Sequence, residues 1–263
     1  MSAGGATSDR AELSAALGRL ATTPVLLVAL DFDGTLAPEV DDPLAARAVP
    51  EAVTAIRRLA DLDATRVALV SGRDLVSLGT VAEVDEDVLL VGSHGIELRV
   101  DGHESSLTDA ELALRAELAR VLEDAARGRA GVHVEGKPAG LALHTRTADE
   151  ATTEAVVRDA LAGVAGLSGV TERRGKNVVE FAVRPTGKDD GVRRLRELTG
   201  ATGVLFAGDD VTDEDGFRAL GPGDLGLKVG GGETLASLRV DDAAAVAELL
   251  HELADLRAHL GHA

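Results

Sequence analysis

The chain has 263 residues and a formal net charge of −18, with 45 Asp and Glu against 27 Lys and Arg. It contains no Cys, Trp or Tyr, which excludes disulfides, thiolate chemistry, Cys-based zinc sites and an aromatic platform for stacking a sugar or a base. A net-acidic chain repels the phosphate backbone, so no nucleic-acid partner is expected.

No targeting signal is expected from the N-terminal residues of this sequence. The first 24 residues lack the basic-then-apolar pattern of a signal peptide. The apolar run Val25–Leu30 falls far short of the roughly 18 residues that a membrane-spanning helix needs. We therefore expect a cytoplasmic monomer that has no membrane partner and acts on a small molecule.

Short apolar runs alternate with helical patterns over the first hundred residues. The expected helices are Asp9–Leu20 and Pro50–Ala60, and the expected strands are Val25–Leu30, Arg66–Val70 and Val88–Val91. A continuous apolar run closed by polar residues is typical of a strand buried on both faces of a parallel sheet. The alternation predicts an α/β protein with a doubly wound, Rossmann-like parallel sheet.

The alternation of single strands with single helices stops near residue 101 and resumes near residue 186. The intervening segment predicts helices at Leu107–Arg127 and Ala148–Ala162 and strands at Val132–Glu135, Leu141–Thr145, Gly169–Glu172 and Val178–Val183. After it we expect helices at Lys188–Leu198, Asp213–Leu220 and Ala243–Leu260 and strands at Val204–Ala207 and Gly226–Val229. The sequence thus predicts a core of residues 1–100 and 186–263, interrupted by an inserted α+β cap at 101–185.

The strongest motif is Asp31-Phe-Asp33-Gly34-Thr35, directly after the first buried strand. Open α/β sheets bind ligands at the carboxyl ends of their strands, where this loop lies. Two clustered carboxylates repel one another and favour a divalent cation, and Mg²⁺ prefers oxygen ligands. Gly34 permits a tight turn, and Thr35 offers its hydroxyl to a phosphate oxygen.

A second acidic cluster follows another strand, in Gly208-Asp209-Asp210-Val-Thr-Asp213. It supplies the further carboxylates that a metal site with Asp31 requires. One of these residues is expected to cap the next helix. The spacing leaves open which of Asp209, Asp210 and Asp213 binds the metal directly.

Three residues suggest an anion site beside these carboxylates. Ser71 ends its strand and is expected to open a helix whose N-terminus holds an anion. Lys188 and Arg73 are each expected in the first turn of a helix, where a positive charge opposes the helix dipole. A phosphate or a carboxylate partner accounts for both cations.

The order of these motifs resembles that of the haloacid-dehalogenase-like superfamily of phosphatases. The resemblance implies that Asp31 is the nucleophile and that Asp33 acts as acid and then as base. It further implies that Ser71 and Lys188 hold the phosphate. The Mg²⁺ ligands that it implies are Asp31, the main-chain carbonyl of Asp33, and Asp209.

Polar motifs within the cap and just before it are similar to those of trehalose-6-phosphate phosphatases. The segments concerned are Gly92-Ser93-His94-Gly95-x-Glu97, Glu135-Gly-Lys137 and Gly175-Lys176-Asn177-x-x-Glu180. The resemblance implies sugar contacts from Glu135, Lys137 and Glu180. The full set of substrate-binding residues expected on these grounds is Thr35, Arg73, Ser93, His94, Glu97, Glu135, Lys137, Lys176, Asn177 and Glu180. The implied activity is a Mg²⁺-dependent hydrolysis of trehalose 6-phosphate to trehalose and phosphate through an aspartyl-phosphate.

Other interpretations of the same residues stay open. Glu135 and Lys137 also fit a surface ion pair, and His144 fits a structural histidine. The alternative functions are another cap-bearing sugar phosphatase, a phosphomutase, and a non-catalytic sugar-phosphate sensor. Of the four lysines in the chain, only Lys228, near the end of a core strand, has no role in any of these.

Overall fold

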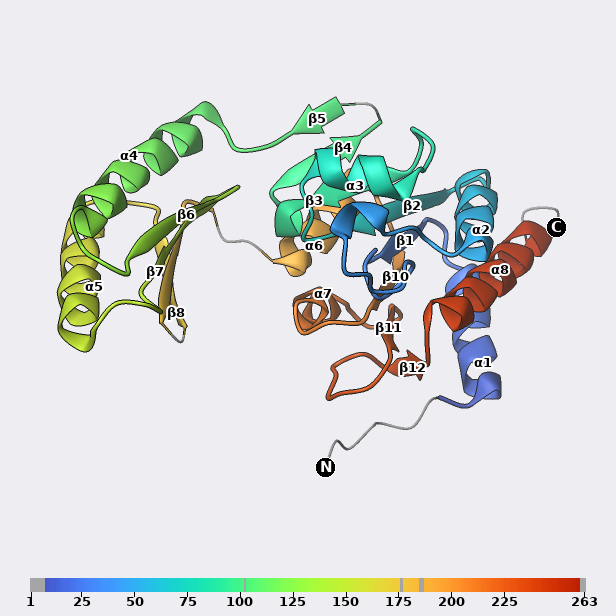
Figure 1. Ribbon diagram of the computed structural model, residues 1–263. Helices are drawn as coiled ribbons and strands as arrows, with labels where there is room; N and C mark the ends of the chain where they lie inside the picture. Colours follow the sequence, from blue (N-terminus) through green and yellow to red (C-terminus); the bar gives the residue numbers. More distant parts are fainter. Residues whose placement is uncertain (1–7, 102, 176, 185–186, 261–263) are drawn as a thin grey trace. The chain divides into compact units, whose positions relative to one another are not determined.

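The structure is a computed structural model, and it describes residues 8–101, 103–175, 177–184 and 187–260 (Figure 1). The chain divides into two compact units. We call Met1–Ser105 together with Gly187–Ala263 the core unit, and Ser106–Thr186 the inserted unit. No helix in the described part of the chain has the length and apolar character that crossing a bilayer requires.

The core unit contains an eight-stranded sheet in the order β12-β11-β10-β1-β2-β3-β4-β5. Its six parallel strands are β1 (Leu26–Leu30), β2 (Thr65–Val70), β3 (Leu89–Gly92), β10 (Gly203–Gly208), β11 (Leu225–Val229) and β12 (Leu238–Val240). The strands β4 (Glu97–Val100) and β5 (His103–Ser105) are antiparallel. The predicted α/β class with a mostly parallel sheet is confirmed.

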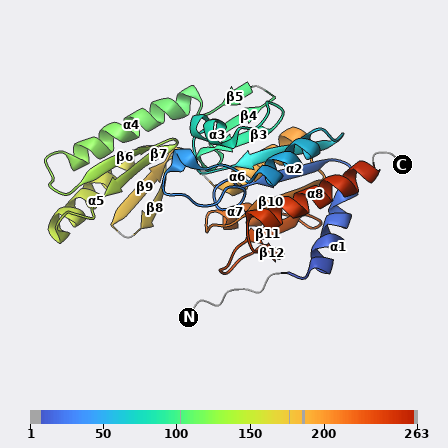
Figure 2. The ribbon, with the colours of Figure 1, turned by 45° about the vertical axis from the view of Figure 1, so that its right-hand side comes forward.

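Helices cover both faces of this sheet. They are α1 (Arg10–Ala21), α2 (Pro50–Ala60), α3 (Leu75–Ala82), α6 (Lys188–Thr199), α7 (Asp213–Arg218) and α8 (Ala243–Leu260), with short 3₁₀ turns at Pro43–Ala45 and Ser93–Gly95. Alternate residues of β1 join two separate apolar clusters, because successive side chains of a strand point to opposite faces. Helices α1, α2 and α8 pack together over one cluster (Figure 2), and α6 and α7 contribute to the other.

Three strands of the core sheet were not predicted. β4 and β5 are short strands at one end of the sheet, in which Arg, Glu and His interrupt the apolar pattern, and β12 has only three residues. Since β5 pairs with β4, the core unit continues to Ser105, whereas the sequence placed the start of the insertion at 101.

The inserted unit is an antiparallel four-stranded sheet with two helices. Its strands, in the order β6-β7-β9-β8, are β6 (His133–Lys137), β7 (Gly140–His144), β9 (Val178–Ala182) and β8 (Thr171–Gly175). The helices α4 (Asp109–Ala126) and α5 (Glu150–Val164) pack against each other, and α4 packs on β6 and β7 (Figure 1).

The two faces of this sheet differ in polarity. Leu141, Leu143 and Phe181 are buried on one face. One cross-strand row runs through Glu135, Ala142, Glu180 and Arg173. Glu135, Glu180 and Arg173 therefore share the opposite face. We call the face that carries Glu135 and Glu180 the polar face of the inserted unit.

Candidate functional site

The predicted carboxylates and cations converge at the carboxyl edge of the core sheet. Asp31, Ser71 and Asp209 follow β1, β2 and β10, which are adjacent parallel strands, and Lys188 begins α6. They line a cavity of about 1010 Å³ that lies within the core unit. Of the residues selected from the sequence, those lining it are Asp31, Asp33, Ser71, Arg73, His94, Lys188, Asp209 and Asp210.

Lys188 joins two carboxylates in the floor of this site. Its Nζ donates to Asp31 Oδ1 at 2.6 Å and to Asp213 Oδ1 at 2.7 Å, and all three residues are buried. Burial acts to lower the pKa of Lys188, but the charges and hydrogen bonds of the two carboxylates outweigh it and raise that pKa. The lysine is therefore held charged, which explains a cation at the start of a helix.

The carboxyl group of Asp31 is strongly perturbed. Burial raises its pKa to about 8, although the charge of Lys188 acts in the opposite direction. The charges of Asp213 and Asp209 raise it further. The negative charges at this point thus exceed what Lys188 neutralises, so a further cation is favoured here.

The side chain of Asp209 lies against Gly34, which has no side chain to occupy that space. Gly34 has a φ of +77°, and a Cβ at this position would lie 2.1 Å from Asp209 Oδ2. The Thr35 hydroxyl lies 3.4 Å from Asp31 Oδ2 and 3.3 Å from Asp209 Oδ1, and its single proton serves one of them at a time. Thr35 is fully buried against these carboxylates and is not among the residues that line the cavity, so its expected contact with phosphate stays a prediction.

Asp213 is fully engaged with the protein. Its Oδ1 accepts from Lys188, and its Oδ2 accepts the main-chain N–H groups of Asp209 and Asp210 at 3.0 and 2.9 Å. It lies at the start of α7 with no exposed surface. This residue therefore fixes the loop that carries Asp209 and Asp210.

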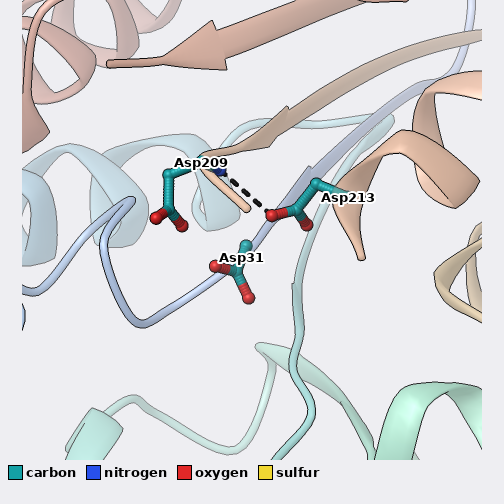
Figure 3. A group of neighbouring side chains, drawn as sticks. All are labelled: Asp31, Asp209 and Asp213. Atoms are coloured by element: carbon teal, nitrogen blue, oxygen red, sulfur yellow. Dashed lines mark hydrogen bonds between the residues drawn. The ribbon is translucent and has the colours of Figure 1, made fainter. Parts of the chain in front are cut away.

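Asp31, Asp209 and Asp213 form a compact acidic cluster (Figure 3). Each offers a carboxylate oxygen, and these oxygens lie within 4.8 Å of one another. An all-oxygen donor set with surplus negative charge fits Mg²⁺. The family resemblance implies Asp31, the main-chain carbonyl of Asp33, and Asp209 as ligands, with Asp213 as a supporting residue; the choice among Asp209, Asp210 and Asp213 stays open, and both oxygens of Asp213 already accept hydrogen bonds.

The side chain of Asp33 lies apart from this cluster in an ion pair with Arg73. Arg73 Nε donates to Asp33 Oδ2 at 2.6 Å, and Nη2 donates to Oδ1 at 2.7 Å. These bonds raise the pKa of Arg73. The carboxylate partner that the sequence predicted for Arg73 is thus Asp33.

The predicted helix position of Ser71 and Arg73 is wrong. Helix α3 begins at Leu75 with Asp74 as its N-cap, so both residues precede the helix. Arg73 N donates to Ser71 Oγ at 3.1 Å, which makes the segment a polar turn after β2. The sequence pattern could not place the cap, because Ser71 and Asp74 are both good N-cap residues.

The segment after β3 divides its polar residues between two roles. Ser93 Oγ donates to Glu97 Oε2 at 2.5 Å, and the same oxygen accepts from Leu75 N at 3.3 Å. Neither Ser93 nor Glu97 lines the cavity, whereas His94 does. The ring of His94 lies over Gly72, where a Cβ would meet its Cε1 at 2.7 Å. Ser93 and Glu97 thus hold the turn that presents His94, and the substrate contacts expected of them stay predictions.

A second set of predicted residues lies on the polar face of the inserted unit. Glu135 accepts from Lys137 at 2.9 Å and contacts His144 Nε2 at 2.8 Å. The hydrogen bond with Lys137, followed by that with His144, lowers the pKa of Glu135. Asn177 has a φ of +59° in the turn between β8 and β9.

The remaining residues divide into those not described and those not predicted. Lys176 lies outside the described residues. Sequence reasoning did not select Glu39, Asp41 and Ser77, which line the cavity. Their signal is weak, since acidic residues and serines are common in loops and turns. Sequence reasoning also gave no role to Lys228. This lysine is buried, and it donates to the main-chain carbonyl of Asp209.

Comparisons with known proteins agree on one family. The sequence profile described as trehalose-phosphatase matches residues 29–237. The bifunctional trehalose-6-phosphate synthase/phosphatase of Thermoproteus tenax is 39% identical over 86% of this chain, and the trehalose-phosphate phosphatase of Mycobacterium marinum is 34% identical over 91%. The chain spans only 32% and 64% of these two relatives.

A solved structure of the Aspergillus fumigatus trehalose-6-phosphate phosphatase has a similar fold. It superposes with a TM-score of 0.79 at 27% identity, and the match covers 95% of this chain and 98% of that one. The similarity therefore extends over both units of the chain.

The buried carboxyl group of Asp31 predicts a pH-dependent cost in stability. Its pKa rises from 3.8 to about 8 on folding, so its contribution to stability is complete below pH 3.8 and is lost as the pH rises through 8. Asp31→Asn stays neutral at every pH, so the metal-free variant should have a higher Tm than the metal-free parent. This increase in Tm should be a few degrees larger at pH 8 than at pH 5.5.

Thermal unfolding in the presence of a chelator measures this difference. Asp210→Asn is the matched control, because Asp210 lines the same cavity but is exposed. An Asp31→Asn effect that is the same at both pH values would contradict the assignment of this cost to the buried charge.

Proposed function

Because the chain belongs to the trehalose-phosphatase family, we propose that it hydrolyses trehalose 6-phosphate to trehalose and phosphate. The observation that carries this proposal is the buried Asp31–Lys188–Asp213 arrangement beside Asp209, at the carboxyl edge of the core sheet. It provides a nucleophilic carboxylate, a fixed cation and an acidic cluster on one side of one cavity.

Asp31 and Asp209 would hold Mg²⁺, with the main-chain carbonyl of Asp33 as a further ligand. Asp213 is left out of this set because both of its oxygens already accept hydrogen bonds within the protein. The bound metal would supply positive charge to the phosphate oxygens and to Asp31. Lys188, which donates to Asp31 Oδ1, supplies the second positive charge.

The first chemical step is the attack of Asp31 on phosphorus. A bond forms between a carboxylate oxygen of Asp31 and phosphorus, while the bond from phosphorus to the sugar oxygen breaks. A protonated Asp33 gives its proton to that leaving oxygen, and the product is the free sugar and an aspartyl-phosphate. Asp33 has to release Arg73 for this step, because both of its carboxylate oxygens accept hydrogen bonds from Arg73 in the structure.

The second step returns the enzyme to its starting state. Water attacks phosphorus, its proton passes to the Asp33 carboxylate, and the bond between phosphorus and Asp31 breaks. The ionised Asp33 that Arg73 holds is the form needed to accept this proton. Ser71 and Lys188 contact the phosphate oxygens in both steps, and inorganic phosphate leaves.

Sugar recognition is assigned to Glu135, Lys137 and Glu180. Carboxylates accept hydrogen bonds from sugar hydroxyls and an ammonium donates to them, so these groups meet a disaccharide without any aromatic side chain. Lys137 and His144 hold the Glu135 carboxylate in place before a ligand is bound. The cytoplasmic location and the monomeric state stay predictions from the sequence.

A panel of sugar phosphates tests the proposed substrate. With Mg²⁺, phosphate release from trehalose 6-phosphate should exceed that from sucrose 6-phosphate or mannose 6-phosphate by roughly tenfold or more, because only the correct sugar satisfies the polar groups of its site. A chelator should abolish release from every substrate. Equal or faster release from the other sugar phosphates would favour a different sugar phosphatase, and no release at all would favour a sensor.

The polar face of the inserted unit should affect the sugar substrate selectively. Lys137→Ala or Glu180→Ala removes a charged hydrogen-bonding group, so kcat/KM for trehalose 6-phosphate should fall about 10- to 100-fold. Turnover of p-nitrophenyl phosphate, which has no sugar, should change little. The control is Glu172→Ala, because Glu172 pairs across the strands with Phe181 and so lies on the other face. Equal losses on both substrates would rule out sugar recognition by these residues.

Asp31→Asn tests the covalent step. The amide is a far weaker nucleophile, so turnover with Mg²⁺ should fall by about 10⁴-fold or more while trehalose 6-phosphate still binds. Phosphate-release assays and calorimetric titration measure the two properties separately. Turnover close to that of the parent would contradict an aspartyl-phosphate at this position.

A further inference from the structure

Lys228 is a buried cation that the proposed mechanism does not use. It lies on β11, where it pairs in register with Gly208, the residue before Asp209, and its side chain is almost completely buried. Its Nζ donates to the main-chain carbonyl of Asp209. Among the ion pairs of the described residues none includes Lys228, so this buried charge has a carbonyl as its hydrogen-bond partner and lacks a paired carboxylate.

Burial of a lysine without a carboxylate partner is costly, so its place in the fold needs a reason. We find that reason in the acidic cluster to which Asp209, the hydrogen-bond partner of Lys228, belongs. Asp31, Asp209 and Asp213 face one another with Lys188 as their bonded cation. A second positive charge at the backbone of Asp209 lowers the repulsion that these carboxylates experience.

Lys228 also completes a clamp on the backbone of Asp209. The N–H of Asp209 donates to Asp213 Oδ2 at 3.0 Å, and its C=O accepts from Lys228. Both polar groups next to the Asp209 Cα are therefore held by buried side chains, one from α7 and one from β11. With the backbone fixed on both sides, the direction in which the Asp209 side chain leaves the main chain is fixed too.

That direction places the Asp209 carboxylate beside Thr35 and over Gly34. Thr35 Oγ1 lies 3.3 Å from Asp209 Oδ1, and the missing side chain of Gly34 leaves room for the carboxylate. If the Asp209 backbone turned, its carboxylate would lose these neighbours and its place next to Asp31. Lys228 reaches this proposed metal ligand through a hydrogen bond to its main-chain carbonyl.

We propose that Lys228 is a positioning residue of the metal site, which orients Asp209 for Mg²⁺ through its main-chain carbonyl. The inference rests on the proposed function, since it takes Asp209 as a Mg²⁺ ligand. Groups that orient a metal ligand from behind typically contribute 10- to 100-fold in metal affinity. Lys228 should therefore act on Mg²⁺ binding itself, before any substrate is present.

Calorimetric titration of the full chain with Mg²⁺, in the absence of substrate, tests this proposal. Lys228→Met, which keeps the length of the stem but removes the donor and the charge, should bind Mg²⁺ about 10- to 100-fold more weakly than the parent. The matched control is Arg239→Met. Arg239 is a buried cation that pairs in register with Lys228 on β12, and its guanidinium bonds to the carbonyls of Gly230 and Gly232 instead of Asp209.

Arg239→Met should retain the parent affinity within about twofold, and circular dichroism should show both variants folded. If Lys228→Met does not fold, Lys228→Gln replaces it, because a glutamine is one bond shorter and neutral and should show the same loss. Parent-like affinity in the folded Lys228 variant, or an equal loss in Arg239→Met, would overturn the positioning role. Failure of the parent to bind Mg²⁺ would instead overturn the proposed cofactor, and the positioning role with it.

Discussion

The site depends on keeping mutually repelling carboxylates close together in a buried place. Asp31, Asp209 and Asp213 offer oxygens within 4.8 Å of one another, and Lys188 bonds to two of them. Burial and the neighbouring carboxylates raise the pKa of Asp31, which measures how unfavourable its charged form is without a further cation. The same imbalance favours a divalent cation at this position.

Such an arrangement holds only because rigid elements supply its parts. Adjacent parallel strands deliver Asp31 and Asp209 to one edge of the sheet, and the first residue of α6 delivers Lys188. Hydrogen bonds then fix the loops: Asp213 holds the main-chain N–H of Asp209, and Lys228 holds its C=O. Charged groups in the core unit thus serve the geometry of the site at a cost in stability, as is common where function requires buried charge.

Under the proposed function, the inserted unit would recognise the sugar with the charged residues of its polar face. The chain has no Trp or Tyr, so a sugar cannot be held by stacking on them. The polar face of the inserted unit offers Glu135 and Glu180 in one cross-strand row, with Lys137 bonded to Glu135. On the opposite face Leu141, Leu143 and Phe181 are buried, and α4 packs on β6 and β7.

The sequence by itself determined the α/β class and the strand-end positions of Asp31, Ser71 and Asp209, because apolar runs followed by polar loops are a local pattern. Local pattern did not reveal the short strands β4, β5 and β12, whose pairing with neighbouring strands is a tertiary property. Only the tertiary structure decided which residues form hydrogen bonds with one another in the site. It pairs Arg73 with Asp33, uses Ser93 and Glu97 to support a turn, and gives Lys228 a place behind Asp209. A side chain's hydrogen-bond partner depends on which distant segments the fold brings within about 3 Å, and residue type and spacing do not contain that distance.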